Sequence, residues 1–471
     1  MNRQKPLTSL FTKRKPNFLI LMVDEELYPS VYEPDEVGAW PKKNLLMQEL
    51  LLENGFEFKN HYIGSSASSP SEMTLYTGQY PSLHGVTQTS FSAKTQFNHD
   101  IDSNHVPTMR DYLQKAGYQA YWKEKCFASV KGIQVANQST AAATNEESVS
   151  DVVYADEVMA LLQKLDREET EESKQWVIFS SFLSEQSHGQ VMKVFQTLKK
   201  TTFYRNTIVL FLLIEGQGLG ADGKRNEKRN NVFEKSIHVP LIVHSPALFN
   251  GKKSTTMLTS HVDVLPTMLG LAGIDEEEIQ TLLSFDYTEV RPLVGRDLTP
   301  LLSGKKRFYR ANEPLYFMTN DDGRRGLNGA PEESEELVVQ PNHIEAVMTT
   351  LHTGDEDQKE VWKYARYYDD PQFWRIPGVS DVTVTQSNSV PSEVEEPLSR
   401  WVTTTKTTPA PDEFELYNVT RDPLEEKNLA HPNFETPESK ENQKVLSLIL
   451  EEQRRQKRLS PRRSGAGNVA M

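Results

Sequence analysis

The stretch at residues 65–81 reads Ser65-Ser66-Ala67-Ser68-Ser69-Pro70-Ser71-Glu72-Met73-Thr74-Leu75-Tyr76-Thr77-Gly78-Gln79-Tyr80-Pro81. Hydroxyl side chains crowd a proline-containing turn that runs into a predicted helix. Negative charge is favoured at a helix N-terminus, because the first backbone N–H groups have no partner inside the helix. A serine on this turn is therefore well placed to attack a sulfate or phosphate ester. The same residues also fit a serine-rich helix cap without chemistry, and the stretch alone leaves both interpretations open.

Buried strands and amphipathic helices alternate around this stretch. Apolar, β-rich runs predict strands at residues 18–23, 56–62, 119–123, 176–183, 207–214 and 239–244. Helical spacing of apolar residues predicts helices at 45–53, 106–116, 152–165, 190–200 and 264–272. Alternation of this kind predicts an α/β protein with a large, mostly parallel sheet sandwiched by helices. In such sheets ligands bind at the carboxyl ends of the strands.

The pattern weakens beyond about residue 310, which suggests a smaller C-terminal α+β subdomain. Residues 321–336 and 383–411 are rich in polar residues, proline and charge, and are predicted to be long loops. The expected organisation is an N-terminal extension at 1–14, a main domain at 15–310, a C-terminal subdomain at 311–432 and a charged, partly disordered tail at 433–471. Within this tail, residues 440–458 are a candidate helix and residues 460–471 are expected to be disordered.

Composition limits the classes of function. The chain has 471 residues, 37% of them apolar and 25% charged, as in an ordinary globular protein, and a net charge of −14 argues against nucleic-acid binding. Cys126 is the only cysteine, so neither an intrachain disulfide nor a cysteine-based zinc site is expected. The apolar run at 18–23 is too short for a signal peptide or a membrane span. We therefore expect a cytoplasmic protein without membrane association.

Residues 68–86 resemble the signature of the sulfatase family. That signature has Cys or Ser, any residue, Pro, Ser and Arg, then a helix and Thr-Gly-x-Tyr-Pro; Ser68-Ser69-Pro70-Ser71, Thr77-Gly78-Gln79-Tyr80-Pro81 and His84-Gly85-Val86 fit it. The similarity extends over residues 15–430, through stretches such as 234–243, 260–267, 295–304, 361–367 and 415–425. The resemblance implies the alkaline-phosphatase-like sulfatase fold.

The resemblance also implies a divalent cation, Ca²⁺ or Mg²⁺, held by acidic residues after two strands. Asp24 and Glu25 take the places of the first pair. At the second pair, Ile214 stands where the family has an acid, which leaves Glu215 and, further along, Asp222 as ligands. Such a site is expected to hold its cation weakly, with several waters.

Ser68 takes the place of the family's nucleophile, which active sulfatases convert to formylglycine. Glu72 stands where the family has an arginine that supports this group and belongs to the sequence read for its conversion. The formylglycine at Ser68 is therefore in doubt, and a carboxylate at 72 repels an anionic substrate. An unconverted Ser68 hydroxyl needs activation, because it is a poor nucleophile.

Four further residues are candidates for the sulfate pocket that the resemblance implies. Lys125 matches a sulfate-binding lysine, with Lys123 two residues before it. Arg229 replaces a second lysine and keeps its charge. The family's leaving-group histidine has no clear match, and His188 is the nearest candidate; a solvated loop histidine is the alternative.

Three interpretations remain open at this point. The first is a metal-dependent sulfuric ester hydrolase acting on a small anionic ester, with turnover that is weak or lost because of the substitutions. The second is a degraded homologue that binds an anion or a protein partner. The third is a phosphodiesterase or phosphatase using unmodified Ser68. The sequence leaves the natural substrate and the oligomeric state open, a homo-oligomer included.

Overall fold

The computed structural model describes most of the chain. It describes residues 14–23, 28–34, 37, 46–66, 68–86, 106–123, 147–170, 173–182, 188–216, 231–304, 310, 312–320, 341, 343–352, 359–369, 381–387, 400–406 and 408–462. Within the described ranges, no helix has the length and apolar character needed to cross a membrane.

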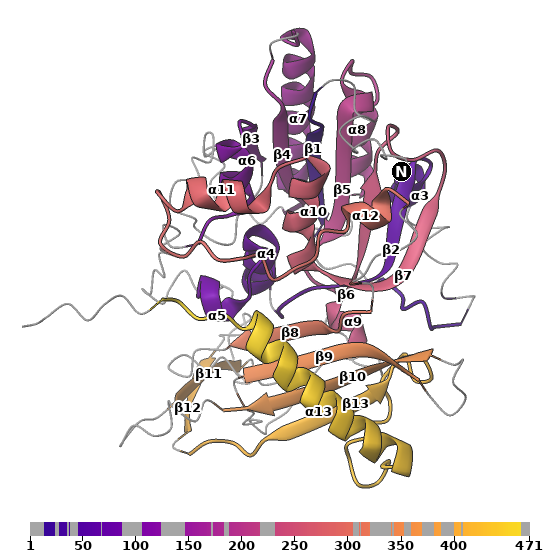
Figure 1. Cartoon of the computed structure of the whole chain (residues 1–471), viewed down its shortest axis with the longest axis vertical. Coiled ribbons are helices and arrows are strands. Elements are labelled where there is room, and N and C mark those ends of the chain that lie inside the picture. Colours follow the sequence, from indigo (N-terminus) through magenta and orange to yellow (C-terminus); the bar gives the residue numbers. More distant parts are fainter. Residues whose placement is uncertain are drawn as a thin grey trace, which may run out of the picture.

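The main element is a seven-stranded sheet of order β3-β4-β1-β5-β6-β2-β7 (Figure 1). Its strands are β1 (Asn17–Val23), β2 (Gly55–Tyr62), β3 (Gln119–Lys123), β4 (Trp176–Phe182), β5 (Thr207–Leu213), β6 (His238–His244) and β7 (Lys253–Ser260). Every neighbouring pair is parallel except the two that involve β6, which runs antiparallel to β5 and β2. The sequence-based prediction of a mostly parallel sheet is confirmed.

Burial explains why the central strands are apolar along their whole length. All seven residues of β1 are buried, and successive side chains point to opposite faces of the sheet. Leu19, Leu21 and Val23 pack in the core on one face, and Phe18 and Ile20 pack in the core on the other. A strand covered on both faces therefore shows a continuous apolar run instead of alternation.

Helices supply the two covering layers. They are α3 (Leu46–Leu52), α4 (Ser68–Thr77), α5 (Pro81–His84), α6 (Met109–Lys115), α7 (Glu147–Arg167), α8 (His188–Leu198), α9 (Glu234–Ile237), α10 (Val264–Leu271), α11 (Glu276–Leu283) and α12 (Thr299–Leu302), with short 3-10 turns at Tyr204–Asn206 and His261–Asp263. Helices α3, α7 and α8 bury their apolar residues in one core, and α4, α6, α10 and α11 bury theirs in the other.

A second, antiparallel sheet of order β13-β10-β9-β8 lies below the main sheet in Figure 1. Its strands are β8 (Leu315–Asn320), β9 (His343–His352), β10 (Lys359–Tyr368) and β13 (Glu413–Asn418), and β11 (Asp381–Ser387) pairs with β12 (Arg400–Lys406) in a separate ladder. Helix α13 (Pro437–Lys457) crosses this sheet. The fold class, an α/β sheet sandwiched by helices beside a smaller α+β part, is confirmed.

The structure differs from the sequence-based expectation at several elements. The charged candidate helix at 440–458 is found as α13 at Pro437–Lys457, and its packing was not predicted: Leu446 and Leu450 are buried in one core with Trp362. The predicted loop around 383–411 contains β11 and β12. Helix α7 begins at residue 147, inside residues 134–150, whose polar composition predicts a loop. Strand β7 and helix α11 were not predicted, since only three of the eight β7 residues are buried and α11 opens with three glutamates.

Candidate active site

Helix α4 places hydroxyl side chains in the protein interior. All ten of its residues are buried, although half of them are serine or threonine. Thr74 and Thr77 each donate a hydrogen bond to the carbonyl one turn earlier, at 2.7 and 2.6 Å, which satisfies hydroxyls that would otherwise be costly to bury. The sequence therefore forms a helix here without an apolar stripe.

Ser68, the first residue of α4, is joined to Glu215. The Ser68 Oγ donates a hydrogen bond of 2.6 Å to Glu215 Oε1, and only 6% of Ser68 is exposed. Glu215 follows β5 by two residues, so the pair lies at the carboxyl edge of the main sheet. The distance is in the range of an O–H to carboxylate bond. The arrangement is that of a hydroxyl beside an acceptor for its proton.

A second set of contacts fixes α4 against the end of β5. Ser71 Oγ donates to the backbone oxygen of Ile214 at 2.5 Å and lies 3.3 Å from His261 Nδ1. The other ring nitrogen of His261 lies 3.1 Å from the oxygen of Leu213. Burial lowers the pKa of His261 to about 4, so the ring is neutral at physiological pH. Ser71 and His261 thus hold the residues just before Glu215.

Glu72 is the charged residue that follows Ser68 by one helical turn. Its carboxylate is 1% exposed, and Tyr76, a further turn along, donates a hydrogen bond of 3.1 Å to Glu72 Oε1. Tyr76 packs edge-on against Trp122, with ring centroids 4.9 Å apart. Residues four apart share one face of a helix. A second carboxylate is therefore buried on the same face of α4 as the Ser68 hydroxyl.

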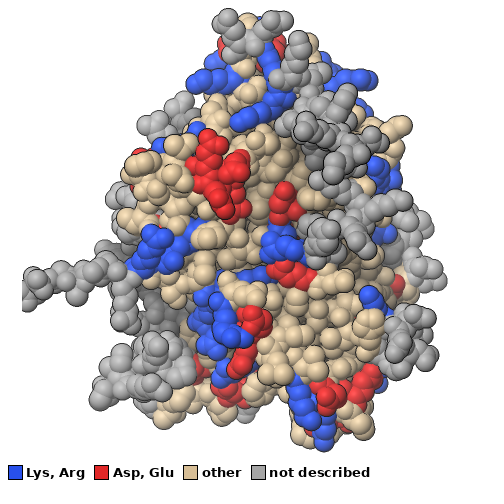
Figure 2. Space-filling view, viewed as in Figure 1, with Lys and Arg blue, Asp and Glu red and all other residues tan. Residues whose placement is uncertain are grey.

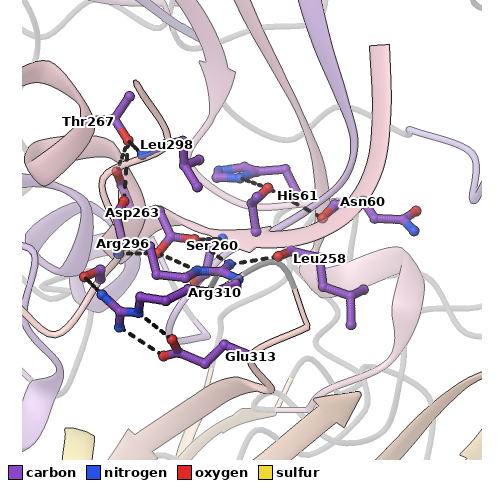
Figure 3. A network of polar contacts seen from close by, with 12 residues as sticks. Asn60, His61, Leu258, Ser260, Asp263, Thr267, Arg296, Leu298, Arg310 and Glu313 are labelled. Atoms are coloured by element: carbon purple, nitrogen blue, oxygen red, sulfur yellow. Dashed lines mark hydrogen bonds and ion pairs between the residues drawn. The ribbon is translucent and has the colours of Figure 1, made fainter. Parts of the chain in front are cut away.

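Arg296 forms a buried ion pair with Asp263, the last residue of the 3-10 turn that contains His261. Figure 3 shows the Arg296 guanidinium between Asp263 and the backbone of Leu258, with N–O distances of 2.8 and 2.7 Å. Asp263 Oδ2 also accepts the Ser260 amide at 3.0 Å, which caps the 3-10 turn that contains His261. The side chains of Arg296 and Asp263 are 2% and 3% exposed. Their ion pair fixes the turn that carries His261, the residue that contacts Ser71.

The structure describes only some of the residues that the sequence placed in the site. Ser68 and Glu215 are brought together, and Glu72 lies one turn away. His188 is half-buried and begins α8, so it belongs to a helix and the loop alternative is wrong. Lys123 ends β3 and is described by its backbone alone. The remaining candidates lie outside the described residues: Asp24, Glu25, Lys125, Asp222 and Arg229.

The cation site is only partly described. No group of three or more His, Cys, Asp or Glu side chains that could hold a metal occurs within the described ranges. Of the four carboxylates proposed as ligands, Glu215 alone is described. Carboxylate oxygens are the donors that Ca²⁺ and Mg²⁺ prefer, so the chemistry of the complete set fits such an ion.

Sequence reasoning missed the roles of Ser71, His261 and Tyr76. Ser71 and the stretch around His261 were noticed only as parts of matched motifs. Their contacts join segments 190 residues apart, which no local pattern reveals.

Much of the chain is similar to known proteins. The family model described as Sulfatase matches residues 16–190 and 184–274, more than half of the chain. The choline-sulfatase of Rhizobium meliloti is 33% identical over 118 residues, which are 25% of this chain and 20% of that protein. The Delta 4,5-hexuronate-2-O-sulfatase of Bacteroides thetaiotaomicron is 22% identical over 343 residues, covering 56% of this chain and 69% of that one. Six of seven curated relatives are matched over only 11–33% of their own length.

Solved structures agree on the fold. A Bacteroides thetaiotaomicron protein from a glycosaminoglycan-metabolism locus superposes with a TM-score of 0.59 at 14% identity, over 94% of this chain and 96% of that one. The phosphonate monoester hydrolase of Agrobacterium radiobacter gives a TM-score of 0.55 at 12% identity, over 94% and 96%. At such identities the likeness extends to the fold and not to the reaction.

Proposed function

This chain belongs to the sulfatase family, and from that premise we propose that it is a sulfuric ester hydrolase homologue whose turnover of sulfate esters is weak or absent. One observation carries the proposal: the Ser68 hydroxyl has a carboxylate, Glu215, at 2.6 Å and a second, Glu72, buried one turn along the same helix. A sulfate ester is an anion, and two nearby carboxylates disfavour its approach unless cations outweigh them.

The proposed cation would supply that compensation. Members of the family use a divalent cation and a formylglycine. Here Asp24, Glu25, Glu215 and Asp222 would hold Ca²⁺ or Mg²⁺, which neutralises the oxygens of a bound ester. Because Glu215 Oε1 also accepts the hydrogen bond from Ser68, one of the two carboxylate oxygens is already engaged. We expect this shared use to weaken cation binding.

The remaining candidates would serve the substrate. Lys125 and Arg229, with Lys123 beside the first, would bind the sulfate oxygens, and His188 would donate a proton to the leaving oxygen. Because Glu72 takes the place of an arginine that supports formylglycine, we propose that Ser68 remains a serine. The family's leaving-group histidine has no clear match, which costs a rate factor on the order of 10²–10⁴ unless His188 replaces it. The loss of the arginine at position 72 costs about 10²–10³.

On the face drawn in Figure 2, the described charges do not form a track for a polyanion, which supports a small anionic ester. Figure 2 shows basic and acidic side chains interspersed on the drawn face, with no continuous basic stripe among the described residues there. A polyanion would need such a stripe for counterion release.

A direct test measures hydrolysis of 4-nitrophenyl sulfate by the full-length chain with added Ca²⁺ or Mg²⁺, and the mass of the Ser68 peptide. We expect an unmodified serine and a rate close to that of the Ser68→Ala control. Turnover in the ordinary enzymatic range, about 1–10³ per second, together with a formylglycine mass, would show that the proposal is wrong.

A second candidate is a phosphoesterase that uses the unmodified serine, and the Ser68–Glu215 hydrogen bond favours it. In this reaction Ser68 Oγ attacks phosphorus, its proton passes to Glu215 and the leaving alkoxide takes a proton from His188 or water. Water then hydrolyses the phosphoserine. Release of 4-nitrophenol from bis(4-nitrophenyl) phosphate, lost in both Ser68→Ala and Glu215→Gln, is the expected result. Inactivity on both esters, with retained sulfate binding, would favour an anion-binding homologue.

A further inference from the structure

The turn that precedes Ser68 is held by the second sheet. Thr319 lies on β8, and its Oγ1 accepts a hydrogen bond from the backbone N–H of Ser66 at 2.9 Å. The same oxygen lies 2.8 Å from Ser66 Oγ and 3.1 Å from Ser65 Oγ. Three polar atoms of the turn therefore converge on one threonine hydroxyl.

These contacts use every hydrogen-bonding position of the Thr319 hydroxyl. A hydroxyl has one donor and two acceptor positions, and the three partners of Thr319 use all of them. Thr319 is 1% exposed, Ser65 is fully buried and Ser66 is 6% exposed, so water has little access as a replacement partner. Losing the hydroxyl would leave a backbone N–H and two serine hydroxyls short of a partner in the interior.

The backbone of β8 supports the same region from both sides of α4. Before the helix, the Met318 amide donates to the oxygen of Gly64 at 3.2 Å. After it, Tyr80 OH donates to the oxygen of Tyr316 at 2.6 Å. On the side away from β8, Gly64 packs against α4. A Cβ at this position would lie 2.6 Å from the Thr74 methyl. Gly64 is thus closely packed between β8 and the helix.

We propose that Thr319 is a positioning residue, which acts through Ser65 and Ser66 to set the Ser68 hydroxyl against Glu215. The inference rests on the proposed function in one respect, that Ser68 is the reacting group. Thr319 lies beyond residue 274, where the family match ends, and on a sheet that contributes none of the sequence-predicted site residues. The site therefore depends on both sheets.

The test compares three variants of the full-length chain. Thr319→Val keeps the shape and removes the hydroxyl, and Thr319→Ser keeps the hydroxyl and removes the methyl group. Thr349→Val is the matched control, because Thr349 is a buried threonine on the neighbouring strand β9. If Thr319→Val does not fold, Thr319→Ala replaces it, since the smaller side chain leaves space for a water molecule.

Hydrogen exchange of the amides at residues 64–69 is the first readout. We expect Thr319→Val to speed exchange at Ser66 by about tenfold or more, because its amide loses its acceptor. Thr319→Ser and Thr349→Val are expected to stay within about twofold of the wild type. Equal exchange in Thr319→Val and Thr349→Val, or no rescue by Thr319→Ser, overturns the inference.

Residual hydrolysis of bis(4-nitrophenyl) phosphate or 4-nitrophenyl sulfate is the second readout. Thr319→Val is expected to lower kcat by about tenfold and leave KM within about twofold, because the reacting group is displaced while the binding groups are not. An unchanged kcat overturns the inference. If the wild type hydrolyses neither ester, there is no kcat to compare. The hydrogen exchange result alone then decides whether Thr319 positions the turn.

Discussion

The Ser68 turn and the Asp263–Arg296 ion pair differ in the signs of the charges buried there. At Arg296 a guanidinium meets a carboxylate at 2.8 Å and further backbone acceptors, so each charge is compensated. At Ser68 the described charges are carboxylates, Glu215 and Glu72. The first arrangement stabilises the fold, and the second suits a proton acceptor better than an anion site. The comparison teaches that the buried charges of the scaffold are paired, whereas those described around the proposed nucleophile are of one sign.

Breaking the ion pair is expected to have the largest effect. Asp263→Ala leaves Arg296 buried without its partner and removes the cap of the His261 turn, and we expect a loss of about 3–5 kcal/mol in the free energy of unfolding. Urea unfolding measures it. Asp286→Ala, which removes the half-exposed partner of Lys115, is the control and is expected to cost less than about 1 kcal/mol. Similar losses in both variants would remove the contrast drawn above.

Weakening the packing of helix α13 on the second sheet is expected to have the next largest effect. Leu446 of α13 is fully buried and Leu448 is 68% exposed on the same helix. We expect Leu446→Ala to lower the free energy of unfolding by about 2–4 kcal/mol. Leu448→Ala should stay within about 0.5 kcal/mol of the wild type. Equal effects would mean that α13 is not packed as described.

A third buried cluster extends the comparison to pH. Glu425 and Glu234 share Lys363 between the two sheets, and Tyr62 OH donates to Glu234 at 2.7 Å. Burial raises the pKa of Glu425 from 4.5 to about 7, with Glu234 adding to the rise and Lys363 opposing it. Nearby Tyr417 has a raised pKa as well, so it stays neutral in this range. Two carboxylates and one ammonium are charge-balanced only while one proton is retained.

The expected sign follows from that shift. Between pH 4.5 and about 7 the folded state keeps a proton on Glu425 that the unfolded state has lost, so stability falls as pH rises through this window. One proton changes the free energy of unfolding by at most about 1.4 kcal/mol per pH unit. Glu425→Gln should flatten the profile between pH 5 and 8, and the exposed neighbour variant Glu426→Gln should not. A wild-type stability that rises with pH in this range would contradict the assignment.

The smallest effect concerns the charge beside Ser68. Glu72→Gln removes one negative charge with little change of shape, and we expect sulfate to bind up to about tenfold more tightly. Titration calorimetry with sulfate measures the change. Tyr76→Phe, which removes the donor to Glu72 and keeps its charge, is the control and should not tighten binding. Unchanged or weaker binding in Glu72→Gln would show that Glu72 does not oppose the anion.

The fold was open to prediction because its signals are local. Continuous apolar runs at β1, β4 and β5 and the helical spacing between them identify a sheet covered on both faces. The signal failed where burial is partial or charge is dense. At 440–458 the sequence indicates a charged helix, but the packing of Leu446 and Leu450 against the second sheet is visible only in the structure.

The sequence by itself determined the family, the serine at the family's nucleophile position and the carboxylate at residue 72 in place of an arginine, because each is a matter of residue type at a fixed spacing. Tertiary structure alone decided that Ser68 bonds Glu215, 147 residues away, and that Thr319 holds the turn from 253 residues beyond Ser66. The physical reason is that hydrogen bonds need atoms about 3 Å apart, and only the packing of two sheets brings such distant segments together.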